Sequence, residues 1–104
     1  MKYLTSKDEF DAELEQAGNK LVVIDFTATW CGPCRTIAPE FEKLAAQIPD
    51  VIFVKVDVDE AAELSQHCGI SCMPTFQFYK NKVKVAEITG ADLGKLKSTV
   101  AANK

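Results

Sequence analysis

The sequence predicts an α/β fold in which a central mixed sheet of four to five strands is flanked by four helices. Apolar, β-branched segments alternate with segments whose apolar residues recur at helical spacing, which is typical of parallel strands joined by right-handed crossovers. Two strands in the last third of the chain are separated by a short polar segment, which indicates an antiparallel hairpin. No repeat or linker interrupts the 104 residues, so we expect a single domain over residues 1–104.

The composition narrows the class of protein. Apolar residues make up 47% of the chain and charged residues 26%, which is typical of a globular protein and excludes intrinsic disorder. The net charge of −3 argues against nucleic acid as a partner, because basic proteins bind a phosphate backbone. No segment approaches the ~18 apolar residues of a membrane span, and residues 1–8 lack the apolar run of a signal peptide. We therefore expect no membrane partner and a cytoplasmic location.

The first half of the chain carries the signals of a helix, a strand and a second helix. Ser6 and Glu9 have the spacing of a capping box, so a helix should begin at Ser6 and end at Gly18. Residues 21–28 are β-branched and aromatic with little alternation, which predicts a strand buried on both faces. A second helix follows residues 30–34, with its apolar residues along one face.

The second half continues the alternation. Residues 51–58 are mostly apolar and predict another strand, after which Asp59 is expected to cap a short helix that ends near His67. A short strand over residues 2–5 would be the fifth of the sheet. The remaining elements are two strands, the hairpin turn between them and a last helix: residues 74–79, residues 83–88, residues 80–82, and a helix that begins at Asp92.

One motif carries the chemistry: Cys31-Gly32-Pro33-Cys34, between a buried strand and a helix. Cys31 falls near the N-cap, where free backbone N–H groups and the helix dipole stabilise a thiolate. The pKa of its thiol should therefore fall from the free value of about 8.5 toward neutral, which makes Cys31 the nucleophile. Cys34 lies one helical turn further on the same face, so it can reach and resolve a mixed disulfide. Gly32 and Pro33 limit the flexibility of the spacer.

A zinc site is the alternative interpretation of this motif. Cys68 and Cys72 could supply a second pair of ligands. However, 33 residues separate Cys34 from Cys68, whereas roughly 12–20 residues usually separate pairs of zinc ligands. We therefore expect no metal.

Two residues near the motif have further interpretations. Asp25 lies within the apolar segment 22–26, and a buried carboxylate has a raised pKa that lets it carry a proton near neutral pH. Six residues before Cys31, it would lie under the dithiol and take the proton of Cys34. The alternative is an edge or solvent-facing position, although aspartate is disfavoured in strands. Trp30 is either part of the core or a cover over the dithiol that contacts partners.

The chain resembles the thioredoxin family. The resemblance rests on Trp-Cys-Gly-Pro-Cys at residues 30–34, with Asp25 before it and Met-Pro-Thr-Phe at residues 73–76, and it extends over nearly the whole chain. The details are most similar to the cytosolic thioredoxins of animals. The resemblance implies a thioredoxin fold and a cis bond between Met73 and Pro74 that faces the dithiol. It also implies that Cys31 attacks, that Cys34 is the buried resolving thiol, and that Asp25 accepts a proton.

The resemblance further implies a protein-disulfide reductase that carries electrons and contributes to cell redox homeostasis. No cofactor would be bound, because the redox group is the Cys31–Cys34 disulfide. NADPH and FAD would act only through the partner thioredoxin reductase, and the clients would be peroxiredoxins, ribonucleotide reductase and methionine sulfoxide reductase. Lys55 matches a lysine near the aspartate in some members, where it would oppose the effect of burial on Asp25. The client-binding surface would consist of eight residues: Trp30, Gly32, Pro33, Ile70, Met73, Pro74, Gly90 and Ala91.

Cys68 and Cys72 lie outside this motif. They are either a buried helix residue and a partly exposed thiol, or regulatory cysteines. In the regulatory interpretation, oxidation of Cys72 beside the client surface would hinder partners or join two copies of an otherwise monomeric chain. His67, the only histidine, is expected to be structural, at a helix C-terminus. Two alternative functions also remain at this point: a small zinc-binding module, and a non-catalytic protein that holds a partner with its reduced face.

Overall fold

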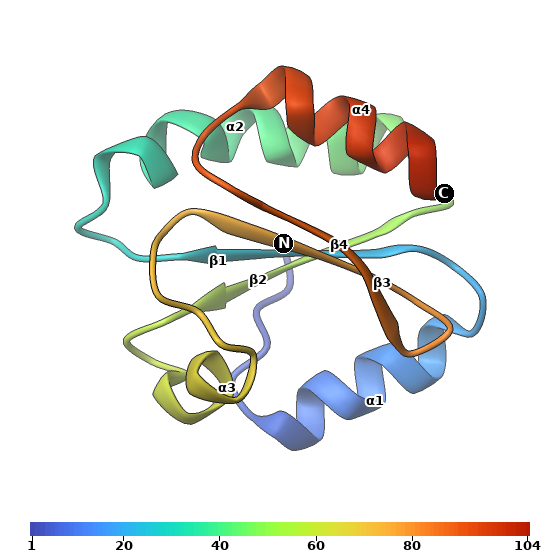
Figure 1. The fold of residues 1–104 in the computed structure, drawn as a ribbon, viewed down its shortest axis with the longest axis horizontal. Helices are drawn as coiled ribbons and strands as arrows, with labels where there is room; N and C mark the ends of the chain where they lie inside the picture. Colours follow the sequence, from blue (N-terminus) through green and yellow to red (C-terminus); the bar gives the residue numbers. More distant parts are fainter.

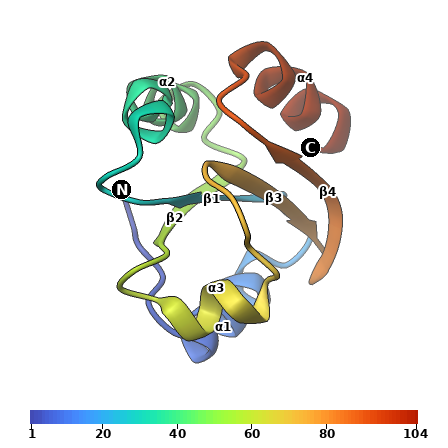
Figure 2. The ribbon, with the colours of Figure 1, turned by 60° about the vertical axis from the view of Figure 1, so that its left-hand side comes forward.

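The computed structural model describes all 104 residues, in which two layers of helices cover a four-stranded sheet (Figure 1). Helices α2 and α4 lie on one face of the sheet, and α1 and α3 lie on the other (Figures 1 and 2). The predicted α/β fold, with four helices and a mixed sheet, is confirmed. The elements are α1 (Lys7–Ala17), β1 (Val22–Thr27), α2 (Gly32–Gln47), β2 (Ile52–Asp57), α3 (Ala62–His67), β3 (Thr75–Lys80), β4 (Val83–Thr89) and α4 (Leu93–Asn103).

The strand order in the sheet is β2-β1-β3-β4. Strands β1 and β2 are parallel, whereas β3 pairs antiparallel with both β1 and β4. The expected fifth strand at residues 2–5 is reduced to a single parallel bridge between Tyr3 and Lys55. Its main-chain bonds run from Leu4 N to Lys55 O, at 2.8 Å, and from Lys55 N to Lys2 O, at 3.0 Å. The sheet thus has four strands and a short extension along the edge of β2.

Alternate residues of the strands face two separate apolar cores. Val23 of β1 and Phe53 of β2 pack with the residues of α2 and α4. Ile24 of β1 and Val54 of β2 pack with α1 and α3. Because both faces of β1 and β2 are covered, these strands read as nearly continuous apolar runs rather than alternating ones. Asp25 lies in register with Lys55, and both belong to the set that faces α2.

The start of α1 differs in one detail from the predicted capping box. The hydroxyl of Ser6 accepts the N–H of Glu9 at 3.1 Å, as expected. The carboxylate of Glu9, however, accepts from the N–H and the hydroxyl of Thr5, both at 2.6 Å, and not from Ser6. The hydroxyl of Ser6 is already engaged by the N–H of Glu9, whereas Thr5 presents its N–H and its hydroxyl together to the carboxylate. The helix ends at Gly18, whose φ of +60° suits a glycine.

The prediction that Asp59 caps α3 is wrong. The N-cap of α3 is Ala61, and no side chain caps the helix. Instead, Asp57 Oδ1 accepts from the N–H groups of Asp59, at 2.9 Å, and Glu60, at 3.3 Å. The turn begins where β2 ends, so the first carboxylate is the one that organises it. The side chain of Asp59 therefore makes no capping hydrogen bond at the start of α3.

The β3–β4 hairpin forms as predicted, with an irregularity beside it. Its turn residues Asn81 and Lys82 both have positive φ, 53° and 67°, as a two-residue hairpin turn requires. A register shift between Phe78 and Tyr79 leaves Val85 of β4 unpaired as a bulge.

The predicted N-cap of α4 is confirmed, because Asp92 accepts the N–H of Lys95 at 3.0 Å. None of the helices has the length and apolar character of a membrane span.

Candidate active site

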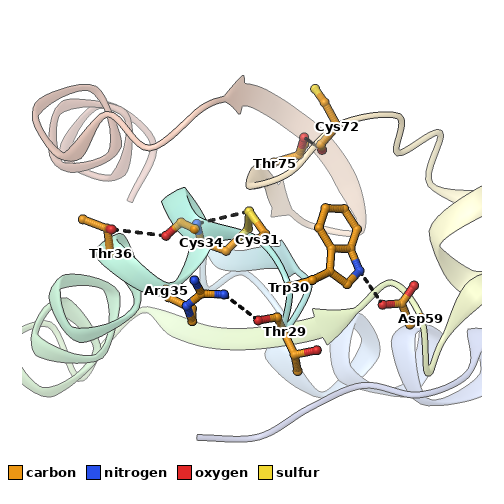
Figure 3. Close-up of a disulfide and its surroundings, with 10 residues drawn as sticks. Thr29, Trp30, Cys31, Cys34, Arg35, Thr36, Asp59, Cys72 and Thr75 are labelled. Carbon is orange, nitrogen blue, oxygen red and sulfur yellow. Dashed lines mark hydrogen bonds between the residues drawn. A yellow bond between two sulfur atoms is a disulfide. The ribbon is translucent and has the colours of Figure 1, made fainter.

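Two cysteines meet at the point where β1 passes into α2. Cys31 is the N-cap of α2, with extended backbone angles, and its sulfur accepts the N–H of Cys34 at 3.2 Å (Figure 3). The two sulfurs form a disulfide, and their Cα atoms are 5.2 Å apart. Pro33 lies in the first helical turn, where its lack of an N–H leaves no bond unmade. The predicted placement of the motif at a strand-to-helix junction is therefore confirmed.

The disulfide lies in a small apolar cluster. Cys31 is 6% exposed and Cys34 is 2% exposed, and both pack with Ala28. Val58 and Met73 cover this cluster from the ends of other segments. Cys31 is therefore the more accessible of the two sulfur-bearing residues, and Cys34 is enclosed.

Asp25 lies in the middle of β1 and is only 1% exposed. Its neighbours in register are Lys55 of β2 and Phe76 of β3. Its Oδ1 atom is buried without a hydrogen-bond partner. Burial raises the pKa of Asp25 from its usual value of 3.8 to about 7, and the charge of Lys55 opposes that rise. The predicted burial is confirmed, and the edge or solvent-facing alternative is excluded.

Lys55 is itself buried, with 5% of its surface exposed. Its ammonium lies 3.3 Å from the carboxylate of Glu42 on α2, and 5.9 Å from the centre of the Tyr3 ring. A pocket of about 230 Å³ adjoins it, and Cys34 is among the residues in the wall of that pocket. The structure thus brings a lysine, a glutamate and a cysteine of the motif to the face of the sheet that holds Asp25.

Trp30 is on the surface, with 63% of its area exposed, so the core interpretation is excluded. Its indole Nε1 donates to Asp59 Oδ2 at 2.8 Å (Figure 3). Next to it, Arg35 of α2 donates to the carbonyl of Thr29 at 2.8 Å. The sequence alone does not identify Asp59 as the partner of Trp30 or Glu42 as the partner of Lys55. These partners lie 29 and 13 residues away along the chain, and no local pattern marks them.

The other residues of the predicted client-binding surface differ in exposure. Met73 and Pro74 are joined by a cis bond, and Pro74 is buried, with its carbonyl accepting the N–H of Gly90 at 2.9 Å. The main-chain N–H and carbonyl of Met73 make no hydrogen bond within the molecule. Trp30, Pro33, Gly90 and Ala91 are exposed, and Gly32, Ile70 and Met73 are half-buried.

The remaining cysteines lie apart from the disulfide. Cys68 is the half-buried C-cap of α3, and burial raises the pKa of its thiol. Cys72 is exposed, its carbonyl accepts the hydroxyl of Thr75 at 2.7 Å, and its thiol points away from the disulfide (Figure 3). No three His, Cys, Asp or Glu side chains are placed to hold a metal ion. His67 is an exposed residue in the last turn of α3, with the edge of its ring toward Phe10.

This fold and site define a thiol–disulfide oxidoreductase, in which two cysteines form a disulfide at the start of a helix that follows a central strand. The family model for thioredoxin matches residues 2–102, and the chain belongs to the thioredoxin family. The thioredoxin of Ophiophagus hannah is 50% identical over 100 residues, which cover 96% of this chain and 95% of that protein.

Solved structures give the same answer. The crystal structure of Fasciola hepatica thioredoxin is 40% identical, with a TM-score of 0.99 over the whole of both chains. A structure describing the thiol-resolving mechanism of a yeast mitochondrial 1-Cys peroxiredoxin, through the glutathione and thioredoxin systems, is also similar. Its identity is 38% and its TM-score 0.92, covering 98% of this chain and 94% of that one.

The comparisons confirm the predicted resemblance to thioredoxins of animals, the thioredoxin fold and the activity. The chain is a protein-disulfide reductase, and its redox group is the Cys31–Cys34 disulfide. Its partners belong to the two classes that the family uses, a reductase and proteins that carry disulfides.

Proposed function

We propose that Cys31 is the attacking thiol and Cys34 the resolving thiol of a general protein-disulfide reductase. One observation carries this assignment: Cys31 is the N-cap of α2 and its sulfur accepts the N–H of Cys34. A donor at hydrogen-bond distance and the positive end of the helix dipole both favour a thiolate over a thiol. Cys34 lies inside the first turn, enclosed by the apolar cluster, so it reacts only with a sulfur attached to Cys31.

The reaction transfers two electrons to the client. The Cys31 thiolate attacks one client sulfur, the client S–S bond breaks, and the second client sulfur leaves as a thiolate. Cys34 then gives up its proton and attacks the Cys31 sulfur. The bond between Cys31 and the client breaks as the Cys31–Cys34 bond forms, and the client sulfurs take up protons. The protein ends oxidised, and the client ends as a dithiol.

Asp25 is the proposed acceptor of the Cys34 proton. A general base works best when its pKa lies near the operating pH, and the pKa of Asp25 is about 7. Its Oδ1 atom has no partner in the folded molecule, so it is free to bind a proton. It lies on the face of the sheet that α2 covers, and Cys34 belongs to α2. The transfer occurs directly or through a water molecule.

Clients are proposed to bind beside the disulfide as an extended segment. The free N–H and carbonyl of Met73 can pair with such a segment in the manner of an added strand. Trp30, the neighbour of Cys31 in the sequence, supplies a large exposed ring that is held by Asp59. The proposed surface comprises Trp30, Gly32, Pro33, Ile70, Met73, Pro74, Gly90 and Ala91, of which Pro74 is buried and lies beneath the main chain of its neighbour Met73.

A thioredoxin reductase, a flavoprotein that carries FAD and uses NADPH, is proposed to return the disulfide to the dithiol. Peroxiredoxins, ribonucleotide reductase and methionine sulfoxide reductase are proposed as clients, in a cytoplasmic setting. The likeness to the structure concerned with a yeast peroxiredoxin and the thioredoxin system supports the first of these. The 104 residues are proposed to act as one domain, and the family model spans nearly all of them.

The test of this assignment is the reduction of insulin disulfides with dithiothreitol as the reductant. The Cys34→Ser variant should lose most of the turnover. The same variant, reduced and then mixed with insulin after the dithiothreitol has been removed, should accumulate a mixed disulfide that is visible by non-reducing electrophoresis. Cys68→Ser is the matched control, and it should reduce insulin at the wild-type rate. If Cys34→Ser reduces insulin as fast as the wild type, the dithiol mechanism is wrong.

Cys68 and Cys72 are the regulatory candidates, and exposure favours Cys72. Its thiol is proposed to form a disulfide between two copies of the chain under oxidation. Under mild peroxide the wild type should then show a dimer band that Cys72→Ser lacks. Identical monomer bands for the two proteins would contradict this proposal. Cys68 is a weaker candidate, because burial raises the pKa of its thiol and lowers its thiolate fraction.

A further inference from the structure

A buried lysine lies next to a buried aspartate in the sheet, yet the two form no ion pair. Asp25 and Lys55 are register partners on adjacent parallel strands, so their side chains leave the sheet on the same face. Asp25 Oδ1 has no partner, although an ammonium stands on the neighbouring strand. Lysine has a long and flexible side chain, so its ammonium can reach any of several nearby carboxylates and pairs with the one that gives the most favourable interaction. Something other than Asp25 holds the Lys55 ammonium.

That holder is Glu42, whose Oε2 lies 3.3 Å from Lys55 Nζ. Cys34, Ala38 and Glu42 follow one another at intervals of four along α2, which places them on one line of the helix. Cys34 and Ala38 line the same pocket as Lys55, and Glu42 lies one turn beyond. Glu42 therefore lies on the same side of α2 as Cys34, and this side faces Lys55.

The charged and titratable groups around Lys55 come from three segments. They are Lys55 and Asp57 of β2, Cys34, Arg35 and Glu42 of α2, and Tyr3 of the N-terminal segment. On the same face, Lys80 of β3 donates to the carbonyl of Asn103 on α4 at 3.2 Å. The other residues that β3, β4 and α4 contribute to the core there are apolar: Phe76, Phe78, Ile88, Leu96 and Val100.

Two of these groups already have partners. Asp57 Oδ1 accepts two main-chain N–H groups in the turn after β2, and Arg35 donates to the carbonyl of Thr29. Lys55 is therefore the one cation of this set that can exchange Glu42 for Asp25.

We propose that Glu42 is a positioning residue, whose carboxylate holds the Lys55 ammonium out of ion-pair contact with Asp25. The inference rests on the proposed role of Asp25 as the acceptor of the Cys34 proton. Without Glu42, the ammonium would turn to the nearest buried carboxylate, which is Asp25. An ion pair there would favour the charged form of Asp25 and weaken it as a base. Glu42 thus sets the pH range in which Asp25 exchanges a proton, although it touches neither sulfur.

The test is a carboxyl ¹³C NMR titration of Asp25 in the oxidised protein. In Glu42→Gln the midpoint should fall by about one pH unit, which is the lower end of the effect of a close opposite charge. Glu42 is half-exposed, so this substitution leaves the core intact. The resolution rate of a preformed mixed disulfide, measured against pH in the same variant, should shift its acid limb in the same direction.

Two further variants separate positioning from a simple loss of charge. Glu40→Gln removes the same charge from α2, two residues away, where the carboxylate pairs with Lys43 at 3.7 Å; it should leave the midpoint unchanged. In the double variant Glu42→Gln with Lys55→Met, the midpoint should return to the wild-type value or above it, because no ammonium remains to pair with Asp25. Methionine suits the buried site of Lys55, since it is long and apolar.

The inference is overturned if Glu42→Gln titrates like the wild type, if Glu40→Gln shifts the midpoint equally, or if the shift persists in the double variant. The NMR titration involves no client and no turnover. One outcome is that the midpoint of Asp25 shifts as expected while the resolution rate does not change with the protonation of Asp25. In that case the positioning role of Glu42 stands, and the proposed role of Asp25 as the base fails.

Discussion

Two polar side chains that the sheet buries on its opposite faces, Gln77 and Asp25, differ in their hydrogen bonding. Gln77 of β3 is fully buried, and it lies in register with Ile24, which packs with α1 and α3. Its Nε2 donates to the carbonyl of Cys68 at 2.9 Å and to Glu87 at 2.7 Å, and its Oε1 accepts from Tyr79 at 2.8 Å.

Asp25 of β1 is as deeply buried on the side of α2 and α4, but its Oδ1 has no partner. A buried polar group with its bonds made stabilises the fold, whereas one without them costs free energy. The missing hydrogen bond of Asp25 therefore distinguishes a buried polar group proposed to act in catalysis from one that stabilises the fold. The four predictions that follow test this contrast, from the largest expected effect to the smallest.

Asp25→Asn should stabilise the oxidised protein in alkaline solution. The folded-state pKa of about 7 lies above the usual 3.8, so between these values the folded state holds a proton that the unfolded state has lost. Stability therefore falls as the pH rises, by roughly 4 kcal/mol in total above pH 7. Asparagine cannot ionise, so urea unfolding should show a gain approaching this size at pH 8.5 and little change at pH 4. A gain of equal size at both pH values would contradict the raised pKa.

Gln77→Leu should have the opposite consequence. Leucine nearly preserves the volume but leaves the carbonyl of Cys68, the Glu87 carboxylate and the Tyr79 hydroxyl without their shared partner. The free energy of unfolding should fall by about 3 kcal/mol. Insulin reduction per folded molecule should stay at the wild-type rate, because Gln77 faces away from α2. Urea titration and the insulin assay measure both quantities, and a loss of activity in the folded variant would break the contrast between the faces.

Ser6→Ala should cost about 1 kcal/mol, because it removes the side-chain acceptor at the N-cap of α1. Helix α1 lies on the same side of the sheet as Gln77, so activity should again be unaffected (Figure 1). Ser71→Ala is a suitable control, since Ser71 is exposed and makes no hydrogen bond through its hydroxyl. Equal denaturation midpoints for the two variants would show that the cap contributes nothing.

Ser65→Ala tests an exception on the side of α1 and α3. The hydroxyl of Ser65 on α3 is buried and has no hydrogen-bond partner. Its removal takes away a desolvated polar group and introduces the best helix former, so stability should rise by about 0.5 kcal/mol. A thermal melt beside Ser6→Ala would show two serine-to-alanine changes of opposite sign. A clear loss of stability in Ser65→Ala would mean that this hydroxyl is bonded in solution.

The fold could be predicted from the sequence because its signals are local. Both faces of β1 and β2 are covered, so residues 21–28 and 51–58 read as apolar runs, and the observed strands fall within these ranges. The disulfide could also be predicted, since its whole motif occupies four consecutive residues. Asp59 shows the limit of such reasoning. The sequence offers carboxylates at positions 57 and 59, and only the end of β2 decides which of them organises the turn.

The surroundings of the site depend on contacts between distant segments, which no single stretch of sequence encodes. Whether Trp30 is core or surface is decided by packing around the end of β1, and its partner Asp59 lies beyond β2. The ion pair of Lys55 with Glu42 depends on how α2 crosses β2. The burial of Asp25 could be predicted from its apolar neighbours in the sequence. The pairing of Lys55 with Glu42 rather than with Asp25 could not.

The two edge strands of the sheet, β2 and β4, are both protected against pairing with a strand of another molecule. Along β2, residues 2–4 pair with both main-chain groups of Lys55, in the middle of the edge that a foreign strand would join. Along β4, the bulge at Val85 and the charge of Lys84 disfavour a regular partner. The proposed docking point for extended peptides, the main-chain N–H and carbonyl of Met73, is only one residue long. A docking point of this length would hold flexible segments of many sequences weakly, and it would not support the growth of a fibre.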